Sequence, residues 1–200
     1  MRILLIRHGM TEGNIHRRYN GRTDDPLCEQ GILQAQDAGV LVNMEHVYVS
    51  PMKRAMQTAR ICFPNAQMHI IEDLREMDFG DFEGRTADEM ACDVAYLEWI
   101  RGNCEGQCPN GESISSFQKR VQTAFEIVIR DAFEHQLKEL AIVAHGGSIM
   151  AIMSMFADPD RNYYDWYVPN CCGYEIILDQ KTWRVIPRFS EYKYLDRLKI

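Results

Sequence analysis

Arginine and histidine side chains stand at the ends of three apolar segments of this 200-residue sequence. Arg7 and His8 end the first segment, Arg54 lies in the first turn of a helix expected after the second, and His145 follows the third. Arginine gives two parallel hydrogen bonds to phosphate, and a helix N-terminus also favours anions. Imidazole acts as a nucleophile or exchanges a proton near neutral pH. If the three segments are parallel strands, the pattern predicts a phosphate pocket that contains two imidazoles.

The segments that would position these residues alternate between strands and helices. Strands are predicted over residues 2–7, 46–49, 68–71 and 140–144, and helices over 29–42, 51–62, 86–100, 113–137 and 147–156. Ser50 and Pro51 indicate a helix start, with Ser50 as the N-cap. Two more strands, residues 173–178 and 183–189, are expected to be joined by a turn. The alternation predicts a single domain over residues 1–200, a three-layer α/β/α sandwich with a mostly parallel central sheet and one antiparallel edge strand.

Four short motifs occur in a fixed order over residues 1–150. They are Arg7-His8-Gly9 with Thr11 and Asn14, Ser50-x3-Arg54-Ala55-x-Gln57-Thr58-Ala59, Leu74-Arg75-Glu76-x2-Phe79-Gly80-x2-Glu83-Gly84, and Val143-x-His145-Gly146-Gly147. A lone Arg-His-Gly is a weak signal, whereas four ordered motifs are a specific one. Together they resemble the signature of the histidine phosphatase superfamily, also called the phosphoglycerate mutase-like family.

The resemblance implies a role for each of five residues. His8 would attack phosphorus and form a phosphohistidine that water then hydrolyses. Arg7 and Arg54 would neutralise the phosphoryl oxygens and disfavour the imidazolium form of His8. His145 would add a hydrogen-bond donor, and Glu76 would protonate the leaving oxygen. Taken singly, each arginine would be read as a surface ion pair and each histidine as a hydrogen-bonded structural residue.

The remaining pocket residues are also implied by the resemblance. Asn14 and the amide of Gly146 would complete the phosphate cradle, and Asn20 and Gly21 would line the pocket mouth. Only the resemblance singles out Glu76 among the acidic residues of the 73–85 loop, for which a solvated acidic loop is the alternative.

Two activities share this signature, namely phosphatases and mutases that return the phosphoryl group to a product. The chain is short and its region 86–112 is compact, which favours a phosphatase. Its length, the run Pro109-Asn110-Gly111-Glu112-Ser113 and the expected carboxyl-terminal hairpin are similar to those of phosphatases that act on α-ribazole 5′-phosphate in cobalamin assembly. A broad-specificity phosphatase or a phosphoglycerate mutase is the alternative. Trp99 and aromatic residues near 163–167 would select the substrate, unless they only fill the core.

Composition excludes several other classes of protein. With 22 basic and 29 acidic residues the formal charge is −7, which argues against a nucleic-acid partner. The uncharged run over residues 140–157 contains His145 and two glycines near its start, so a membrane helix is rejected. Seven irregularly spaced cysteines without a secretory signal predict reduced thiols and a cytoplasmic protein.

Two hypotheses from other classes stay open at this point. A catalytically silent phosphate-binding protein would use the same pocket, and a thiol-based metal protein would need Cys104 and Cys108 to converge with other ligands. The phosphohistidine mechanism requires neither a metal nor a cofactor. The expected partner is a small phosphorylated metabolite, and the chain is expected to be a monomer or a homodimer.

Overall fold

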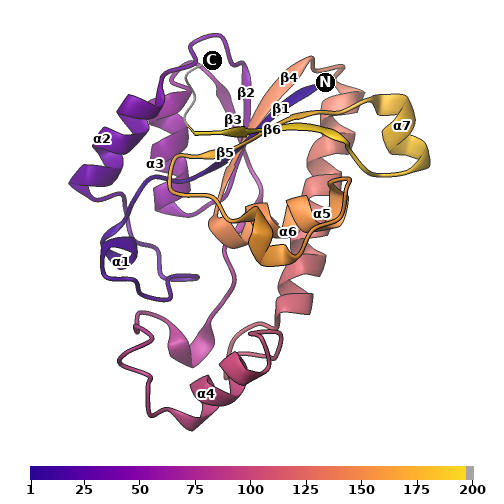
Figure 1. Ribbon diagram of the computed structural model, residues 1–200. Helices are drawn as coiled ribbons and strands as arrows, with labels where there is room; N and C mark the ends of the chain where they lie inside the picture. Colours follow the sequence, from indigo (N-terminus) through magenta and orange to yellow (C-terminus); the bar gives the residue numbers. More distant parts are fainter. Residues whose placement is uncertain (197–200) are drawn as a thin grey trace.

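A six-stranded sheet forms the centre of the computed structural model, which describes residues 1–196 (Figure 1). The strands are β1 (Arg2–Arg7), β2 (His46–Val49), β3 (Gln67–Ile70), β4 (Glu139–Ala144), β5 (Gly173–Ile177) and β6 (Glu191–Leu195). Their order across the sheet is β3-β2-β4-β1-β5-β6. The first four strands run parallel, β5 is antiparallel to β1, and β6 is antiparallel to β5. The predicted antiparallel edge therefore consists of two strands.

The pairing of β1 with β4 determines where the site residues emerge. Residues Ile3 to Ile6 are at most 1% exposed, as expected for a strand that is covered on both faces. In the parallel register Arg7 lies opposite Ala144, and the amide of His8 donates to the carbonyl of Ala144 at 3.0 Å. Consequently His8 and His145 leave the sheet side by side at the carboxyl ends of their strands.

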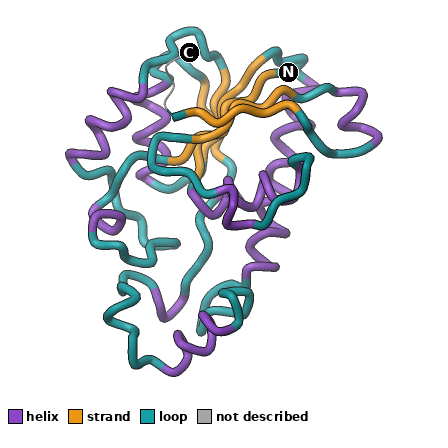
Figure 2. Tube along the Cα trace, in the orientation of Figure 1, coloured by secondary structure: helices purple, strands orange, loops and turns teal. Residues whose placement is uncertain are grey.

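Helices cover both faces of the sheet (Figure 2). They are α1 (Glu12–Ile15), α2 (Glu29–Ala38), α3 (Lys53–Cys62), α4 (Val94–Arg101), α5 (Ile114–Glu134), α6 (Gly146–Phe156) and α7 (Gln180–Val185). Small side chains of α2 and α3 pack with Leu4 and Ile6 on one face, whereas α5 and α6 pack with Ile3 and Leu5 on the other. The predicted α/β/α sandwich is confirmed. The segment that contains α4 extends away from the sheet at the bottom of Figure 1.

Several predicted boundaries are wrong. The helix expected from residue 51 begins at Lys53 with Met52 as its N-cap; the Ser50 Oγ accepts from the amide of Met52 at 3.4 Å and bonds more closely to His145 at 2.8 Å. The helix expected over 86–100 is restricted to α4, where the Asp93 carboxylate accepts from the amides of Ala95 and Tyr96.

The strand expected over 183–189 is also wrong. Asp179 accepts from the amide of Thr182 and starts the short helix α7, and Pro187 cannot donate to a strand ladder. The last strand is instead β6. The apolar run 140–157 is divided between β4 and α6, and among residues 1–196 we find no helix with the length and apolarity that a membrane span requires.

Helix α5 begins where the sequence predicts it. Ser113 is the N-cap, and its Oγ accepts from the amide of Ser116 at 3.2 Å. Replacement by alanine leaves that amide without its partner, so Ser113→Ala should lower the free energy of unfolding by about 1 kcal/mol. Urea denaturation under reducing conditions measures this difference. The exposed Thr123→Ala of the same helix is the control, and an equal loss in both variants would contradict the capping role.

Candidate active site

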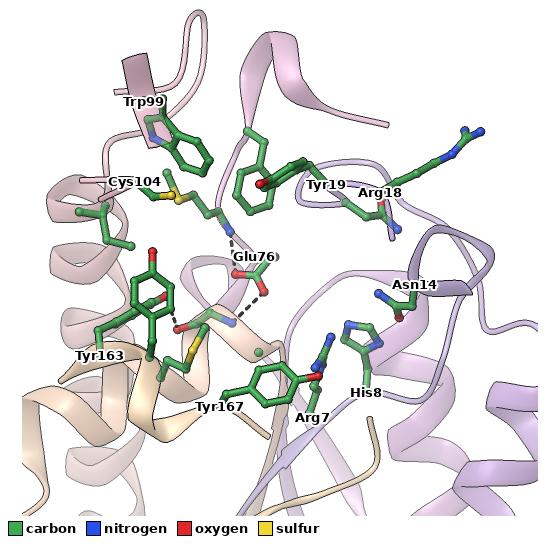
Figure 3. A pocket seen from close by; sticks show the side chains of 18 residues that line it. Arg7, His8, Asn14, Arg18, Tyr19, Glu76, Trp99, Cys104, Tyr163 and Tyr167 are labelled. Carbon is green, nitrogen blue, oxygen red and sulfur yellow. Dashed lines mark hydrogen bonds between the residues drawn. The ribbon is translucent and has the colours of Figure 1, made fainter. Parts of the chain in front are cut away.

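His8 lies at the base of a pocket of about 300 Å³ beyond the end of β1 (Figure 3). Its ring is 4% exposed, and Nδ1 lies 2.6 Å from the carbonyl oxygen of Gly9. A carbonyl only accepts, so Nδ1 carries the hydrogen and Nε2 keeps the lone pair. Burial, followed by the charges of Arg54 and Arg7, holds the pKa of His8 well below its usual value. The ring is therefore a neutral imidazole with a free nucleophilic nitrogen.

Arg7 lines the pocket next to His8. Its Nη1 donates to the carbonyl of Val168 at 2.7 Å, whereas its buried Nε has no partner within residues 1–196. A Cβ at Gly146 would lie 3.4 Å from the Arg7 Nε and Cζ, which is van der Waals contact, so the guanidinium packs directly over this glycine. Arg7 thus retains donors for an anion in the pocket.

Arg54 and His145 lie behind His8 rather than on the pocket wall. Arg54 is 1% exposed, and it donates to the carbonyls of Asn20, Gly21 and Thr23. Its Nε also donates to Nδ1 of His145 at 3.3 Å. Arg54 is not among the residues that line the pocket, and its direct phosphate contact, which the resemblance implies, stays a prediction.

Both ring nitrogens of His145 already have protein partners. Nδ1 accepts from Arg54, so Nε2 carries the hydrogen and donates to the Ser50 Oγ at 2.8 Å. Burial, with the charges of Arg54 and His8 next, lowers the pKa of His145 well below its usual value. Its ring centroid is 5.1 Å from that of His8. His145 therefore packs against the nucleophile as a second neutral imidazole, and its role as a phosphate donor stays a prediction.

Glu76 lies on the pocket wall, and Figure 3 shows its carboxylate across the pocket from His8. Oε2 accepts from the amide of Gly147 at 2.9 Å, and Oε1 accepts from the amide of Met77 at 2.9 Å. A Cβ at Gly147 would come within 2.3 Å of Oε1. The glycine at the start of α6 is therefore required for the position of this carboxylate.

The other expected pocket residues divide into two groups. Asn14, Asn20 and Gly146 line the pocket. The Asn14 Oδ1 accepts from Thr11 and Asn170, which leaves the side-chain amide nitrogen for a ligand.

Gly21 does not line the pocket, contrary to the expectation for this residue. Its carbonyl accepts from Arg54 at 2.8 Å, and a Cβ there would lie 1.7 Å from the carbonyl oxygen of Met77. Gly21 therefore supports the arginine instead of contacting a ligand.

Aromatic rings form much of the pocket wall, and one of them, Tyr167, lies beside Arg7, whose Cζ is 5.6 Å from the ring centroid. The rings are those of Tyr19, Phe79, Trp99, Tyr163, Tyr164 and Tyr167. The Tyr19 ring is edge-on to those of Phe79 and Trp99, with centroids 5.2 and 5.8 Å away. Trp166, in contrast, is fully buried, so for this residue the core interpretation is the correct one.

Sequence reasoning missed the residues that hold the site from behind. Ser50 fixes His145, and Thr58 Oγ1 accepts from the amide of Gly9. The Asn170 side chain donates to the carbonyl of His8, and Glu83 accepts from the amides of Gly21, Arg22 and Thr23. Ser50, Thr58 and Glu83 belong to the quoted motifs and could have been assigned from them. Asn170 carries no signal in the sequence.

The thiol-based metal hypothesis gains no support from the geometry. Within residues 1–196 none of the seven cysteines forms a disulfide, and Cys104 lines the pocket, where burial raises the pKa of its thiol. Burial raises the pKa of Cys108 to about 12. Over residues 1–196 no three His, Cys, Asp or Glu side chains are grouped so that they could hold a metal ion.

Comparisons with known proteins agree with this geometry. The family model described as "Histidine phosphatase superfamily (branch 1)" matches residues 3–188. The chain is 33% identical to the adenosylcobalamin/alpha-ribazole phosphatase of Escherichia coli, over 93% of this chain and 95% of that protein. It is 31% identical to a probable phosphoglycerate mutase of Proteus mirabilis, over 77% of this chain and 74% of that one.

A solved structure is also similar to this one. The crystal structure of a putative alpha-ribazole-5′-P phosphatase from Escherichia coli superimposes with a TM-score of 0.84 at 29% identity, and it covers 100% of this chain and 98% of its own. The fold, the motifs and the family match agree, so the chain belongs to the histidine phosphatase superfamily. It is a phosphatase of that superfamily.

The neutral state of His8 and His145 predicts how stability depends on pH. Their pKa values are lowered in the folded protein, so below about pH 6.5 the unfolded chain binds more protons than the folded one. The free energy of unfolding should therefore fall as pH drops from 7.5 to 5.5, by about 1.4 kcal/mol for each histidine. His8→Asn should reduce the fall by one such contribution. Urea denaturation of both proteins at the two pH values measures it, and an identical fall would show that His8 is not held neutral.

Proposed function

We propose that the chain hydrolyses phosphomonoesters by two successive displacements at His8. One observation carries the proposal. The bond from the Nδ1 hydrogen to Gly9 leaves the Nε2 lone pair available, with Arg7 beside the ring and Glu76 across the pocket. A neutral nucleophile, an arginine that donates hydrogen bonds to an anion, and a general acid–base surround one cavity. These groups match the requirements of phosphoryl transfer.

In the first step, Nε2 of His8 attacks phosphorus as the bond from phosphorus to the ester oxygen breaks. The leaving oxygen takes a proton from the Glu76 carboxyl group, so a neutral alcohol departs. The free donors of Arg7 bind the non-bridging oxygens, and the amide nitrogen of Asn14 can add another donor. The phosphorylated ring is cationic while it keeps its Nδ1 hydrogen, which the carbonyl of Gly9 accepts.

In the second step, water attacks the phosphohistidine. The Glu76 carboxylate takes the proton of the water, the bond between phosphorus and Nε2 breaks, and inorganic phosphate leaves. His8 returns to the neutral form that its surroundings favour, because burial and the charges of Arg54 and Arg7 oppose protonation of the ring.

For the substrate, we propose a phosphomonoester with a planar, uncharged body, of which α-ribazole 5′-phosphate is the leading candidate. Aromatic rings face the body, and among residues 1–196 the basic side chains of the wall are Arg7 and Arg18. A wall of this kind suits a planar ring better than the carboxylate of a phosphoglycerate. The name of the Escherichia coli relative supports the same candidate and a place in cobalamin assembly. The seven cysteines, which form no disulfide within residues 1–196, support a reducing, cytoplasmic location.

A neighbouring groove of about 850 Å³ supports a large substrate body. It shares Cys104, Ile114, Tyr163 and Tyr164 with the pocket, so the two cavities adjoin at these residues. Amide side chains, Ser115 and Glu105 line the remainder of the groove. An uncharged body with hydrogen-bonding groups fits this lining.

The nucleophile is tested by trapping the intermediate. Incubation with a ³²P-labelled phosphomonoester should leave an acid-labile, base-stable adduct on the wild-type protein and none on His8→Ala. The exposed His135→Ala is the matched control and should behave as wild type. Glu76→Gln should still form the adduct, but with a slower rate of turnover because the proton carrier is lost. Hydrolysis of para-nitrophenyl phosphate by His8→Ala at the wild-type rate would contradict the assignment.

The substrate class is tested at Tyr164, which is 56% exposed and lies where the two cavities adjoin. Tyr164→Ala should raise the KM for α-ribazole 5′-phosphate by roughly tenfold or less, the value of one ring contact. The KM for glycerol 2-phosphate, which has no ring, should be unchanged. Equal effects on both substrates would contradict a ring contact, and conversion of phosphoglycerates faster than any hydrolysis would favour a mutase.

A further inference from the structure

Arg120, on α5, uses every donor of its guanidinium group. Nε and Nη2 donate to the two carboxylate oxygens of Glu112 at 2.8 and 2.7 Å. Nη1 donates to the carbonyls of Asp73 and Arg75 at 2.9 and 2.8 Å, and Nη2 also donates to the carbonyl of Glu76 at 3.0 Å. A guanidinium has five N–H groups, so all five are satisfied by this one loop and Glu112.

Glu112, the partner of Arg120, also bonds to the backbone on the other side of Glu76. Its Oε2 accepts from the amide of Asp78 at 2.9 Å, and its own amide donates to the carbonyl of Asp78 at 2.8 Å. The backbone is therefore held just before, at and just after the residue that carries the carboxylate. The two side chains of the pair are only 22% and 23% exposed, so solvent competes little for these bonds.

We propose that Arg120, paired with Glu112, is the positioning residue for Glu76 in catalysis. The proposal rests on the role given above to Glu76 as proton carrier. Arg120 bonds only to the main chain of the loop, and its charge is balanced by Glu112. The Glu76 carboxylate is left to the amides of Gly147 and Met77. Bonds to the main chain fix the position of the loop without placing the guanidinium on the Glu76 carboxylate itself.

Arginine is required at this place for a geometric reason. Lysine has three N–H donors on a single nitrogen, which cannot bond Glu112 twice and reach three carbonyls spread over residues 73–76. Loss of the contacts would let the loop shift, and a displacement of about 1 Å in a catalytic group can cost up to about 10²-fold in rate.

The test compares two substrates that differ in their need for a proton donor. Glycerol 2-phosphate releases an alkoxide that requires protonation, whereas the anion released from para-nitrophenyl phosphate is stable without it. The measured quantity is kcat/KM, which reports the step through formation of the phosphohistidine. Glu76→Gln provides the reference pattern, with a larger loss on glycerol 2-phosphate. Arg120→Lys and Arg120→Met should show the same selective loss, with the ratio of the two kcat/KM values changed by about tenfold or more.

The controls separate this role from a structural one and from failure of the proposed mechanism. Arg130→Met makes the same chemical change at an exposed position of α5 and should leave both kcat/KM values unchanged. If the Arg120 variants lose activity equally on both substrates, or lose none, Arg120 does not act through Glu76. If Glu76→Gln itself shows no selectivity between the substrates, the role of Glu76 as proton carrier fails first. Circular dichroism confirms that Arg120→Lys is folded before the kinetics are compared.

Discussion

The hydrogen bonds between β1 and β4 determine the geometry of the whole site. In their parallel register Arg7 lies opposite Ala144, so the first residues beyond the two strands are His8 and His145. Strands of opposite direction, or a register shifted by one residue, would separate the two rings or turn one of them to another face. The flanking glycines depend on the same register, because Gly146 packs against the Arg7 side chain and the amide of Gly147 donates to Glu76. A few backbone hydrogen bonds of the sheet thus bring together the nucleophile His8, the arginine that binds the anion, and the general acid–base Glu76.

The charge states of the two arginines and the two histidines determine what this geometry can do chemically. The Arg54 guanidinium and two imidazoles are buried together beside the half-buried Arg7, which would be costly if the imidazoles were charged. Both rings are neutral, which avoids this cost. Arg54 donates its hydrogen bonds to the carbonyls of Asn20, Gly21 and Thr23. The same neutrality makes His8 a nucleophile. Stability and catalysis therefore require the same protonation state of His8. Because the ring is neutral, Arg7 lies close to the attacking nitrogen without charge repulsion that would destabilise the fold.

The sequence predicted those parts of the molecule that depend on local pattern. The strands 2–7 and 46–49 are continuous apolar runs and were predicted to the residue, and Ser113 marks the start of α5 by its capping chemistry alone. The interpretation of Ser50 as a cap was wrong because its partner, His145, is 95 positions away. Gly21 was expected at the pocket mouth, but its carbonyl is used by Arg54. Both errors concern side-chain and main-chain contacts that form only after the sheet is assembled, and no local pattern records them.

The two halves of the pocket have different structural origins, and this bears on how specificity can vary in such a fold. The phosphoryl half is built on strand ends and helix N-termini, which the core holds fixed. The opposite half comes mostly from Tyr19, Phe79, Trp99 and the residues around 163, which lie on loops or on the segment with α4 below the sheet in Figure 1. Trp99 belongs to the buried core, and Tyr19, Phe79 and Tyr163 pack against it, so a substitution there changes the packing of this half as well as the pocket wall. A substitution in the aromatic half alters which substrate the pocket accepts beyond its phosphoryl group, and it leaves His8 and Arg7 in place. Glu76 borders both halves, since its loop leads from the sheet towards the α4 segment; the start of α6 binds its carboxylate, and α5 binds the backbone of its loop through Arg120.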